Sequence, residues 1–210
     1  MLIAITGSNG FIGKNLYLNL SQNKNFKVFK ISRQTKINEL KKICKKCDIL
    51  YHLAGANRPK NDSKFNIDNF IYTKKILEAL SKNKKKPPII YTSTSRYNEK
   101  TKYAISKKKA EKIIIQYSKK NLSNYYILRL PNVFGKWAKP FYNSFLTTIF
   151  YQVTRNKTVE ISRKNKEINL IYIDDLIENL KKFINIKKKK SLTKNLKGKK
   201  YKLGFLYNKI

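Results

Sequence analysis

The chain has 210 residues, of which 41% are hydrophobic, so it is long enough to bury the core of one domain. Its longest apolar runs, such as Phe145 to Phe150, fall far short of the roughly 18 residues that span a bilayer. The amino terminus shows no basic stretch followed by an apolar segment and a cleavage site. These features exclude a disordered tail and a membrane span, and they predict a cytoplasmic protein.

The charge balance is strongly basic, with 48 Lys and Arg against 12 Asp and Glu and a formal net charge of +36. Such a balance raises nucleic acid or an anionic membrane as a partner. However, only 6 of the 48 are Arg, and the Lys residues are spread along the chain instead of gathering with aromatic residues in one stripe. We therefore expect no specific nucleic-acid partner, only non-specific binding to polyanions at low salt.

Taken in chain order, the apolar pattern alternates between buried strands and amphipathic helices. Strands are expected at Leu2 to Thr6, Lys27 to Ser32, Ile49 to Leu53, Ile89 to Thr92 and Tyr125 to Leu130. Helices are expected between them, at Phe11 to Leu20, Asn38 to Lys46, Ile67 to Leu80 and Tyr103 to Lys120. This alternation predicts an α/β fold with a doubly wound parallel sheet of the Rossmann type. The lysine-rich stretch from Lys187 to Lys202 predicts a mobile surface segment that need not pack.

The first strand-to-helix turn reads Thr-Gly-Ser-Asn-Gly-Phe-Ile-Gly over residues 6–13. Gly7 allows a tight exit from the strand, Gly10 lets the backbone approach a pyrophosphate, and Gly13 lets the helix pack closely on the sheet. The amides at the helix N-terminus then face the phosphates. Only 7 glycines occur in the chain, so three at this spacing favour dinucleotide binding over a purely structural turn.

The end of the second strand carries Arg33 where a cofactor with a free ribose 2′-hydroxyl usually meets an Asp or Glu. Together with Ser32, the Arg33 guanidinium suits a 2′-phosphate, which favours NADP(H) over NAD(H). The alternative is that Arg33 is one more solvated cation in a very basic chain.

Tyr103 and Lys107 lie four residues apart at the start of the long helix, so both side chains share one helix face. The Lys107 ammonium is expected to lower the pKa of the Tyr103 phenol. The pair follows a cluster of hydroxyl residues, 92–95, at the end of a strand. Together these are the groups needed to protonate a carbonyl oxygen while a hydride reaches its carbon.

Several other polar residues have a structural interpretation. Cys44 and Cys47 are expected in the core, because zinc would need two further ligands and His52 is the only histidine. His52 itself is expected to be a packed strand residue, and no metal site is predicted. Asp174 and Asp175 are expected to cap a helix.

Five segments together resemble the extended short-chain dehydrogenase/reductases that act on nucleotide sugars: residues 6–13, 52–55, 103–107, 129–135 and 172–175. More narrowly, His-Leu-Ala-Gly-Ala-Asn-Arg-Pro (52–59) and Arg-Leu-Pro-Asn-Val-Phe-Gly-Lys-Trp-Ala-Lys-Pro-Phe-Tyr-Asn-Ser (129–144) look like the capsular-polysaccharide reductases of the UDP-N-acetyl-L-fucosamine pathway. These long strings are far more specific than the Tyr and Lys pair.

The resemblance implies NADPH-dependent reduction of a 4-keto sugar carried on UDP. Tyr103 would donate the proton, Lys107 would hold the ribose hydroxyls, and Thr94 would hydrogen-bond the carbonyl, with Thr92 and Ser93 as alternatives. The residues expected to contact the cofactor are Gly7, Gly10, Phe11, Ile12, Gly13, Arg33, Leu53, Ala54, Gly55, Lys107 and Pro131. The diphosphate or sugar would contact Asn132, Lys136 and Asn143. Trp137 with Tyr142 either stacks on uracil or belongs to the aromatic core or rim.

The chain also departs from this group. Its polysaccharide reductases carry a C-terminal cupin-like domain, and the sequence ends at Ile210 without one. We therefore expect that another protein supplies the epimerisation that precedes reduction, or that this copy is a remnant. The expected organisation is a domain over residues 1–186, including a small, incomplete C-terminal substrate lobe at about 136–186, and a lysine-rich segment over 187–210. Analogy with the group also suggests a homodimer.

Two other functions remain open at this point. A nucleotide-sugar 4-epimerase or dehydratase that retains NAD would share the Tyr and Lys. A catalytically silent dinucleotide-binding protein, or a module that binds polyanions, would need neither residue for chemistry.

Overall fold

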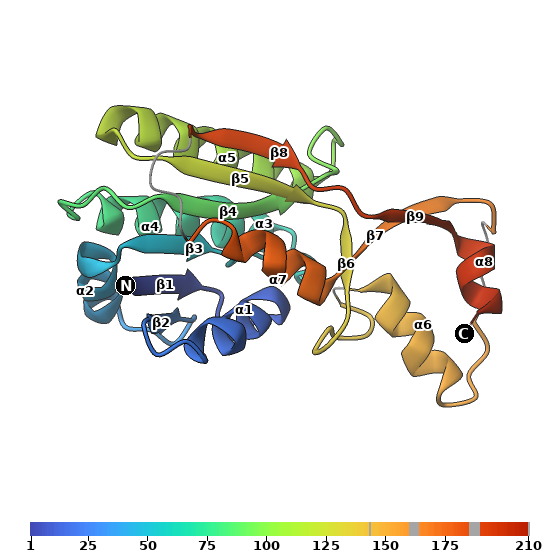
Figure 1. Cartoon of the computed structure of the whole chain (residues 1–210). Helices are drawn as coiled ribbons and strands as arrows, with labels where there is room; N and C mark the ends of the chain where they lie inside the picture. Colours follow the sequence, from blue (N-terminus) through green and yellow to red (C-terminus); the bar gives the residue numbers. More distant parts are fainter. Residues whose placement is uncertain (143, 160–163, 185–189, 210) are drawn as a thin grey trace.

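The computed structural model describes residues 1–142, 144–159, 164–184 and 190–209. Six strands form the main sheet in the order β2-β1-β3-β4-β5-β8, and each neighbouring pair is parallel (Figure 1). The strands are β1 (Leu2–Thr6), β2 (Lys27–Ile31), β3 (Ile49–His52), β4 (Ile89–Thr94), β5 (Tyr125–Leu130) and β8 (Leu192–Asn195). The predicted doubly wound α/β fold is therefore confirmed.

Helices cover both faces of this sheet. One face packs against α1 (Phe11–Ser21) and α7 (Ile173–Lys181). The other packs against α2 (Ile37–Lys46), α4 (Tyr72–Leu80) and α5 (Lys102–Asn121). Because side chains alternate along a strand, Ile3 and Ile5 of β1 join the first core and Ala4 joins the second.

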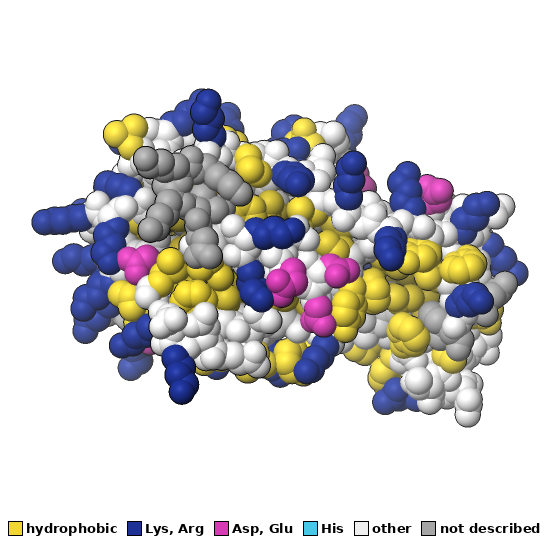
Figure 2. All heavy atoms as spheres, in the orientation of Figure 1, with side chains coloured by type: hydrophobic (Ala, Val, Ile, Leu, Met, Phe, Trp, Pro, Cys, Tyr) yellow, Lys and Arg dark blue, Asp and Glu magenta, His cyan; other side chains and the backbone are white. Residues whose placement is uncertain are grey.

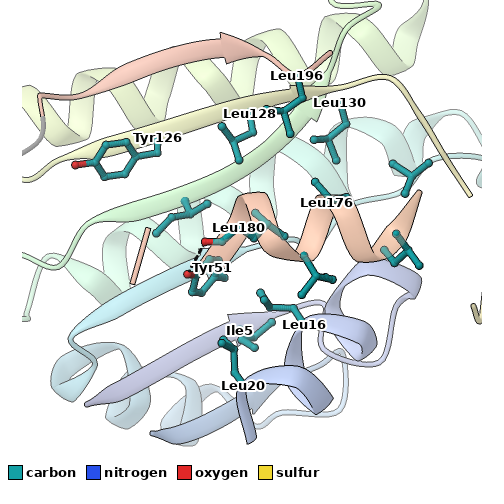
Figure 3. Packing of buried hydrophobic residues seen from close by; sticks show 14 of the residues in the cluster. Ile5, Leu16, Leu20, Tyr51, Tyr126, Leu128, Leu130, Leu176, Leu180 and Leu196 are labelled. Carbon is teal, nitrogen blue, oxygen red and sulfur yellow. Dashed lines mark hydrogen bonds between the residues drawn. The ribbon is translucent and has the colours of Figure 1, made fainter. Parts of the chain in front are cut away.

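Helix α7 connects distant parts of the chain on the first face (Figure 3). Its Leu176 and Leu180 are fully buried in the same cluster as Leu16 of α1 and Tyr51 of β3. The Tyr51 hydroxyl donates a hydrogen bond of 2.9 Å to the carbonyl oxygen of Leu180. A polar group buried in this core therefore has a partner, as stability requires.

The helix predicted over Ile67 to Leu80 has a more complex start. A short helix α3 (Ser63–Phe65) leads into a π-helix, η1 (Asn66–Ile71), which continues as α4. Asn69 of η1 is 1% exposed, and η1 packs against α5. Single π-helical turns of this kind occur frequently at functional sites.

A small lobe extends from the end of the sheet (Figure 1). It contains a three-stranded sheet in the order β6-β7-β9, formed by β6 (Asn132–Phe134), β7 (Glu167–Tyr172) and β9 (Lys199–Lys202). Two helices, α6 (Phe145–Val153) and α8 (Leu203–Asn208), complete the described part of the lobe.

The expectation of an unpacked segment over 187–202 is wrong for its described part. Strand β8 pairs with β5 at the edge of the main sheet, and β9 pairs antiparallel with β7. Leu192 and Leu196 pack against the first core, while Lys194 and its neighbours stay exposed. Lysine-rich strands are compatible with a sheet edge, since solvated charges there oppose pairing with other chains.

The charged surface agrees with the sequence pattern. Lys and Arg side chains are spread over the face seen in Figure 2 and do not form one stripe. None of the described helices combines the length and the apolar character needed to cross a bilayer.

Candidate active site

A crevice of about 860 Å³ opens at the carboxyl ends of the central strands. Its lining comes from the turn after β1, the ends of β2, β3, β4 and β5, and the first turns of α5. The chain crosses from β2 on one side of β1 to β3 on the other, so the crevice lies at the point where the strand order reverses. Ligands of doubly wound sheets bind at this position.

The turn after β1 is shaped by close backbone contacts. Gly7 has φ +70°, and a Cβ there would lie 2.8 Å from the backbone of Ala54. A Cβ at Gly13 would lie 2.1 Å from the carbonyl oxygen of Gly7, so the close contact predicted for Gly13 is made with this turn. The first helical backbone bond runs from the Lys14 amide to the Gly10 carbonyl. The amides of residues 11–13 precede it, so they have no helical acceptor and are available to a ligand.

The end of β2 brings Arg33 to the crevice. Its guanidinium donates a hydrogen bond of 2.9 Å to the carboxylate of Asp68, which comes from η1 and also lines the crevice. Next to it, the Ser32 hydroxyl donates to the Gln34 side-chain oxygen at 2.8 Å.

Tyr103 and Lys107 both face the crevice from α5, and Thr94 faces it from the end of β4. The buried Lys107 ammonium donates to the Thr92 carbonyl at 2.8 Å. The hydroxyl oxygen of Thr94 accepts from the Arg96 amide at 3.1 Å, and its proton has no acceptor among the described residues. The three predicted catalytic side chains therefore line the same crevice.

The alternatives for the third hydroxyl differ in their surroundings. Ser93 also lines the crevice, but its hydroxyl is buried and has no hydrogen-bond partner in the described part of the chain. Thr92 contributes its carbonyl to Lys107. Among these three residues, Thr94 is the one whose hydroxyl oxygen accepts a hydrogen bond from a backbone amide in the described part of the chain, which leaves its O–H free to donate.

Burial shifts the pKa values of Tyr103 and Lys107, and the shift at Tyr103 is opposite to the one predicted from the sequence. Burial raises the pKa of Tyr103 to about 12, and the nearby charge that opposes this rise is Arg96. The expected lowering of the Tyr103 pKa by Lys107 is therefore wrong for the free chain. Burial lowers the pKa of Lys107 to about 7, and the carboxylate of Glu111 opposes that change. Desolvation therefore acts on both groups of the pair, and it outweighs the effect that their spacing predicts for Tyr103.

A buried ion pair lies one turn below Lys107. Glu111 and Arg129 form two hydrogen bonds, of 2.7 and 3.1 Å, and Glu111 is 4% exposed. The Arg129 guanidinium also lies over the Tyr97 ring at 3.3 Å from its centroid. This pair connects α5 to β5 and thereby holds the helix that carries Tyr103 and Lys107 against the sheet.

The residues expected to contact the cofactor all line the crevice, namely Gly7, Gly10, Phe11, Ile12, Gly13, Arg33, Leu53, Ala54, Gly55, Lys107 and Pro131. Of the substrate candidates, Asn132 lines it too, and its amide nitrogen donates to the Asn169 carbonyl at 3.2 Å. Lys136 is absent from the lining, and its ammonium lies over the Trp137 ring at 4.5 Å from the centroid. Asn143 lies outside the described residues. Trp137 and Tyr142 both line the crevice and are partly exposed.

The sequence matches the NAD dependent epimerase/dehydratase family over residues 3–196. The chain belongs to this family. Among curated proteins it is similar to the UDP-2-acetamido-2,6-beta-L-arabino-hexul-4-ose reductase of Pseudomonas aeruginosa, with 34% identity over 185 residues. That match covers 88% of this chain and 50% of the relative, so the chain spans about half of the relative's length.

Solved structures agree with this epimerase/dehydratase fold. The capsular polysaccharide assembling protein CapF from Staphylococcus aureus superposes with a TM-score of 0.86 at 33% identity, over 99% of this chain and 56% of that protein. A UDP-glucuronic acid 4-epimerase from Bacillus cereus, determined in complex with NAD, has a TM-score of 0.84 at 23% identity, over 97% of this chain and 81% of that one. The second likeness shows the shared fold alone.

One residue of this epimerase/dehydratase site was missed by the sequence reasoning. The Asn69 side chain accepts from the Ala56 amide at 2.8 Å and donates to the Ser106 hydroxyl at 2.9 Å. A Cβ at Gly55 would lie 2.6 Å from the side-chain oxygen of Asn69 and 3.3 Å from the Lys107 side-chain nitrogen. Asn69 therefore ties the loop after β3 to α5. Its polar side chain on the buried face of an apolar helix was the signal that could have revealed it.

The structural interpretations of the remaining polar residues can also be checked. Cys44 and Cys47 are fully buried free thiols, and His52 is 1% exposed between the hydroxyls of Thr6 and Thr73, so all three are core residues as predicted. Burial lowers the pKa of His52 to about 3. The two acidic residues lie in the first turn of α7 but make no side-chain cap, so the capping prediction for Asp174 and Asp175 is wrong. Their charges still favour the helix dipole.

Proposed function

We propose that the chain is an NADPH-dependent reductase of a UDP-linked 4-keto-deoxyhexose in the synthesis of surface polysaccharide precursors. The observation that carries this proposal is the meeting of Tyr103, Thr94 and Lys107 in the crevice that also contains the glycine turn. The reductase activity for which the Pseudomonas aeruginosa relative is named supports the same reaction class.

The residues present suit a nicotinamide dinucleotide. Three amides at the start of α1 have no helical acceptor, and a side chain at Gly7 or Gly13 would collide with backbone. This narrow, donor-rich turn suits a pyrophosphate. Arg33 would take a 2′-phosphate, which is the basis for expecting NADPH. When bound, the cofactor would supply the hydride for the sugar carbonyl carbon.

The chain's own groups would supply the proton and the orientation. Tyr103 would donate its hydroxyl proton to the carbonyl oxygen as that oxygen gains charge. The Thr94 hydroxyl would donate a hydrogen bond to the same oxygen, since its own oxygen is already engaged by the Arg96 amide. Lys107, held by the Thr92 carbonyl, would offer its remaining protons to ribose hydroxyls. Asn132 would orient the sugar from the start of β6.

The test is the loss of NADPH absorbance in the presence of UDP-2-acetamido-2,6-beta-L-arabino-hexul-4-ose. Tyr103→Phe is expected to lower the turnover number by about 10²–10⁴-fold, because a positioned proton donor contributes that much, while NADPH binding persists. Tyr125→Phe is the matched control, since Tyr125 starts β5 at the end opposite the crevice. Equal rates in the two variants would refute proton donation by Tyr103. Turnover of a UDP-sugar without net loss of NADPH would indicate the epimerase or dehydratase alternative.

A further inference from the structure

The cofactor end of the crevice contains an acidic residue that the strand sequence does not supply. No acid follows β2, where Ser32, Arg33 and Gln34 stand instead. The fold brings Asp68 to this place from η1, 35 positions further along the chain. All four residues line the crevice.

Asp68 and Arg33 make a direct contact. One guanidinium nitrogen of Arg33 lies 2.9 Å from one carboxylate oxygen of Asp68, in a single hydrogen bond and not a two-bond fork. The Asp68 side chain is 25% exposed and the Arg33 side chain 75% exposed. The Asp68 carboxylate is therefore the less exposed of the two groups. The Arg33 guanidinium extends from it toward solvent and has further N–H donors that Asp68 does not use.

This arrangement has opposite consequences for the two dinucleotides. A 2′-phosphate that binds Arg33 comes within a few ångströms of the Asp68 carboxylate, so it is repelled and has to compete for the same guanidinium. A free 2′-hydroxyl has no charge to repel, and a carboxylate at the ribose can accept its proton. Two groups with opposite preferences thus occupy one end of the crevice.

We propose that Asp68 is a cofactor-selecting residue, whose carboxylate restrains Arg33 and reduces the preference of this chain for NADPH over NADH. The inference rests on the proposed dinucleotide site, but it does not depend on which sugar is reduced. A charge lying within a Debye length of about 8 Å from a phosphate changes binding by about tenfold when solvent screens it only partly.

The experiment measures equilibrium binding of NADPH and of NADH to the full chain. Trp137, the only tryptophan, lines the crevice and serves as the donor for energy transfer to the reduced nicotinamide. Asp68→Asn is compared with Asp62→Asn, which removes the same charge from an exposed pair with Lys102 that lies outside the crevice lining. The control therefore corrects for the general gain in attraction between a more basic protein and an anionic ligand.

We expect Asp68→Asn to raise the ratio of the NADH to the NADPH dissociation constant by about tenfold, and Asp62→Asn to leave that ratio within about twofold of the wild-type value. In an Arg33→Ala background, Asp68→Asn should change the ratio of the two dissociation constants by a smaller factor, because no guanidinium remains to be released from the carboxylate. An unchanged ratio in Asp68→Asn, or an equal change in the control, would overturn the proposal, as would a wild-type chain that binds neither dinucleotide. If the ratio shifts as expected but no sugar is reduced, the proposed function fails and the role of Asp68 stands.

Discussion

Lys107 provides a pH-dependent test of the buried site when it is replaced by Met. The Lys107 side chain is 5% exposed, and burial lowers its pKa from 10.5 to about 7 in the folded chain. Between these two values the unfolded chain binds a proton that the folded chain does not bind. The free energy of unfolding of the wild-type chain should therefore rise with pH in this window. Lys107→Met has no titrating group there and lacks this contribution.

The size of the effect follows from the same two pKa values. The linkage relation predicts that the unfolding free energy of the wild type increases by about 2 kcal/mol more than that of Lys107→Met between about pH 7 and about pH 9. Cys44 and Cys47, whose pKa values burial raises to about 12, titrate differently in the folded and unfolded chains, but they are present in both proteins. Their contribution cancels in the difference.

Urea denaturation of both proteins across this pH range measures the difference directly, since urea adds no charge that would screen the site. A constant difference, or one that falls as the pH rises, would refute the interpretation of Lys107 as a desolvated ammonium. If the difference in unfolding free energy rises only at higher pH, the pKa of Lys107 in the folded chain lies well above 7. The Glu111 carboxylate would then offset most of the effect of burial on that pKa.

Two further substitutions test the turn and the ion pair beneath the site. Gly13→Ala places a methyl group 2.1 Å from the Gly7 carbonyl oxygen. The substitution should therefore lower the free energy of unfolding by about 1–3 kcal/mol and weaken NADPH binding. An unchanged melting temperature together with unchanged NADPH binding would show that the turn can move freely. Glu111→Gln leaves the Arg129 charge buried and uncompensated, which should cost about 3–5 kcal/mol in urea denaturation. Glu178→Gln, at an exposed pair, should cost less than about 1 kcal/mol, and equal losses in both would contradict the difference in burial.

Much of the main sheet was predictable from local sequence. The strand Leu2–Thr6 has the predicted bounds, and β2, β3 and α1 differ from the prediction by a residue at one end. The reason is that hydrophobic spacing reports directly which face of an element is buried. The glycine turn was predictable as well, because glycine alone fits where backbone approaches backbone.

Other features depended on contacts that no local pattern encodes. The lysine-rich segment gave no strand signal, yet β8 forms because the edge of β5 offers unpaired backbone groups. The pKa of Tyr103 is raised, since the elements around the phenol remove water from it. Neither result follows from residue spacing on α5 or in the C-terminal stretch.

The sequence by itself determined the α/β alternation, the glycine turn and the Tyr103 to Lys107 pair, because each rests on residues within a few positions of one another. Only the tertiary structure decided which charges these groups meet. It placed Asp68 against Arg33 and Glu111 against Arg129, from elements that are distant along the chain. The physical reason is that strand and helix periods are local properties, whereas desolvation and charge interactions depend on every element packed around a group.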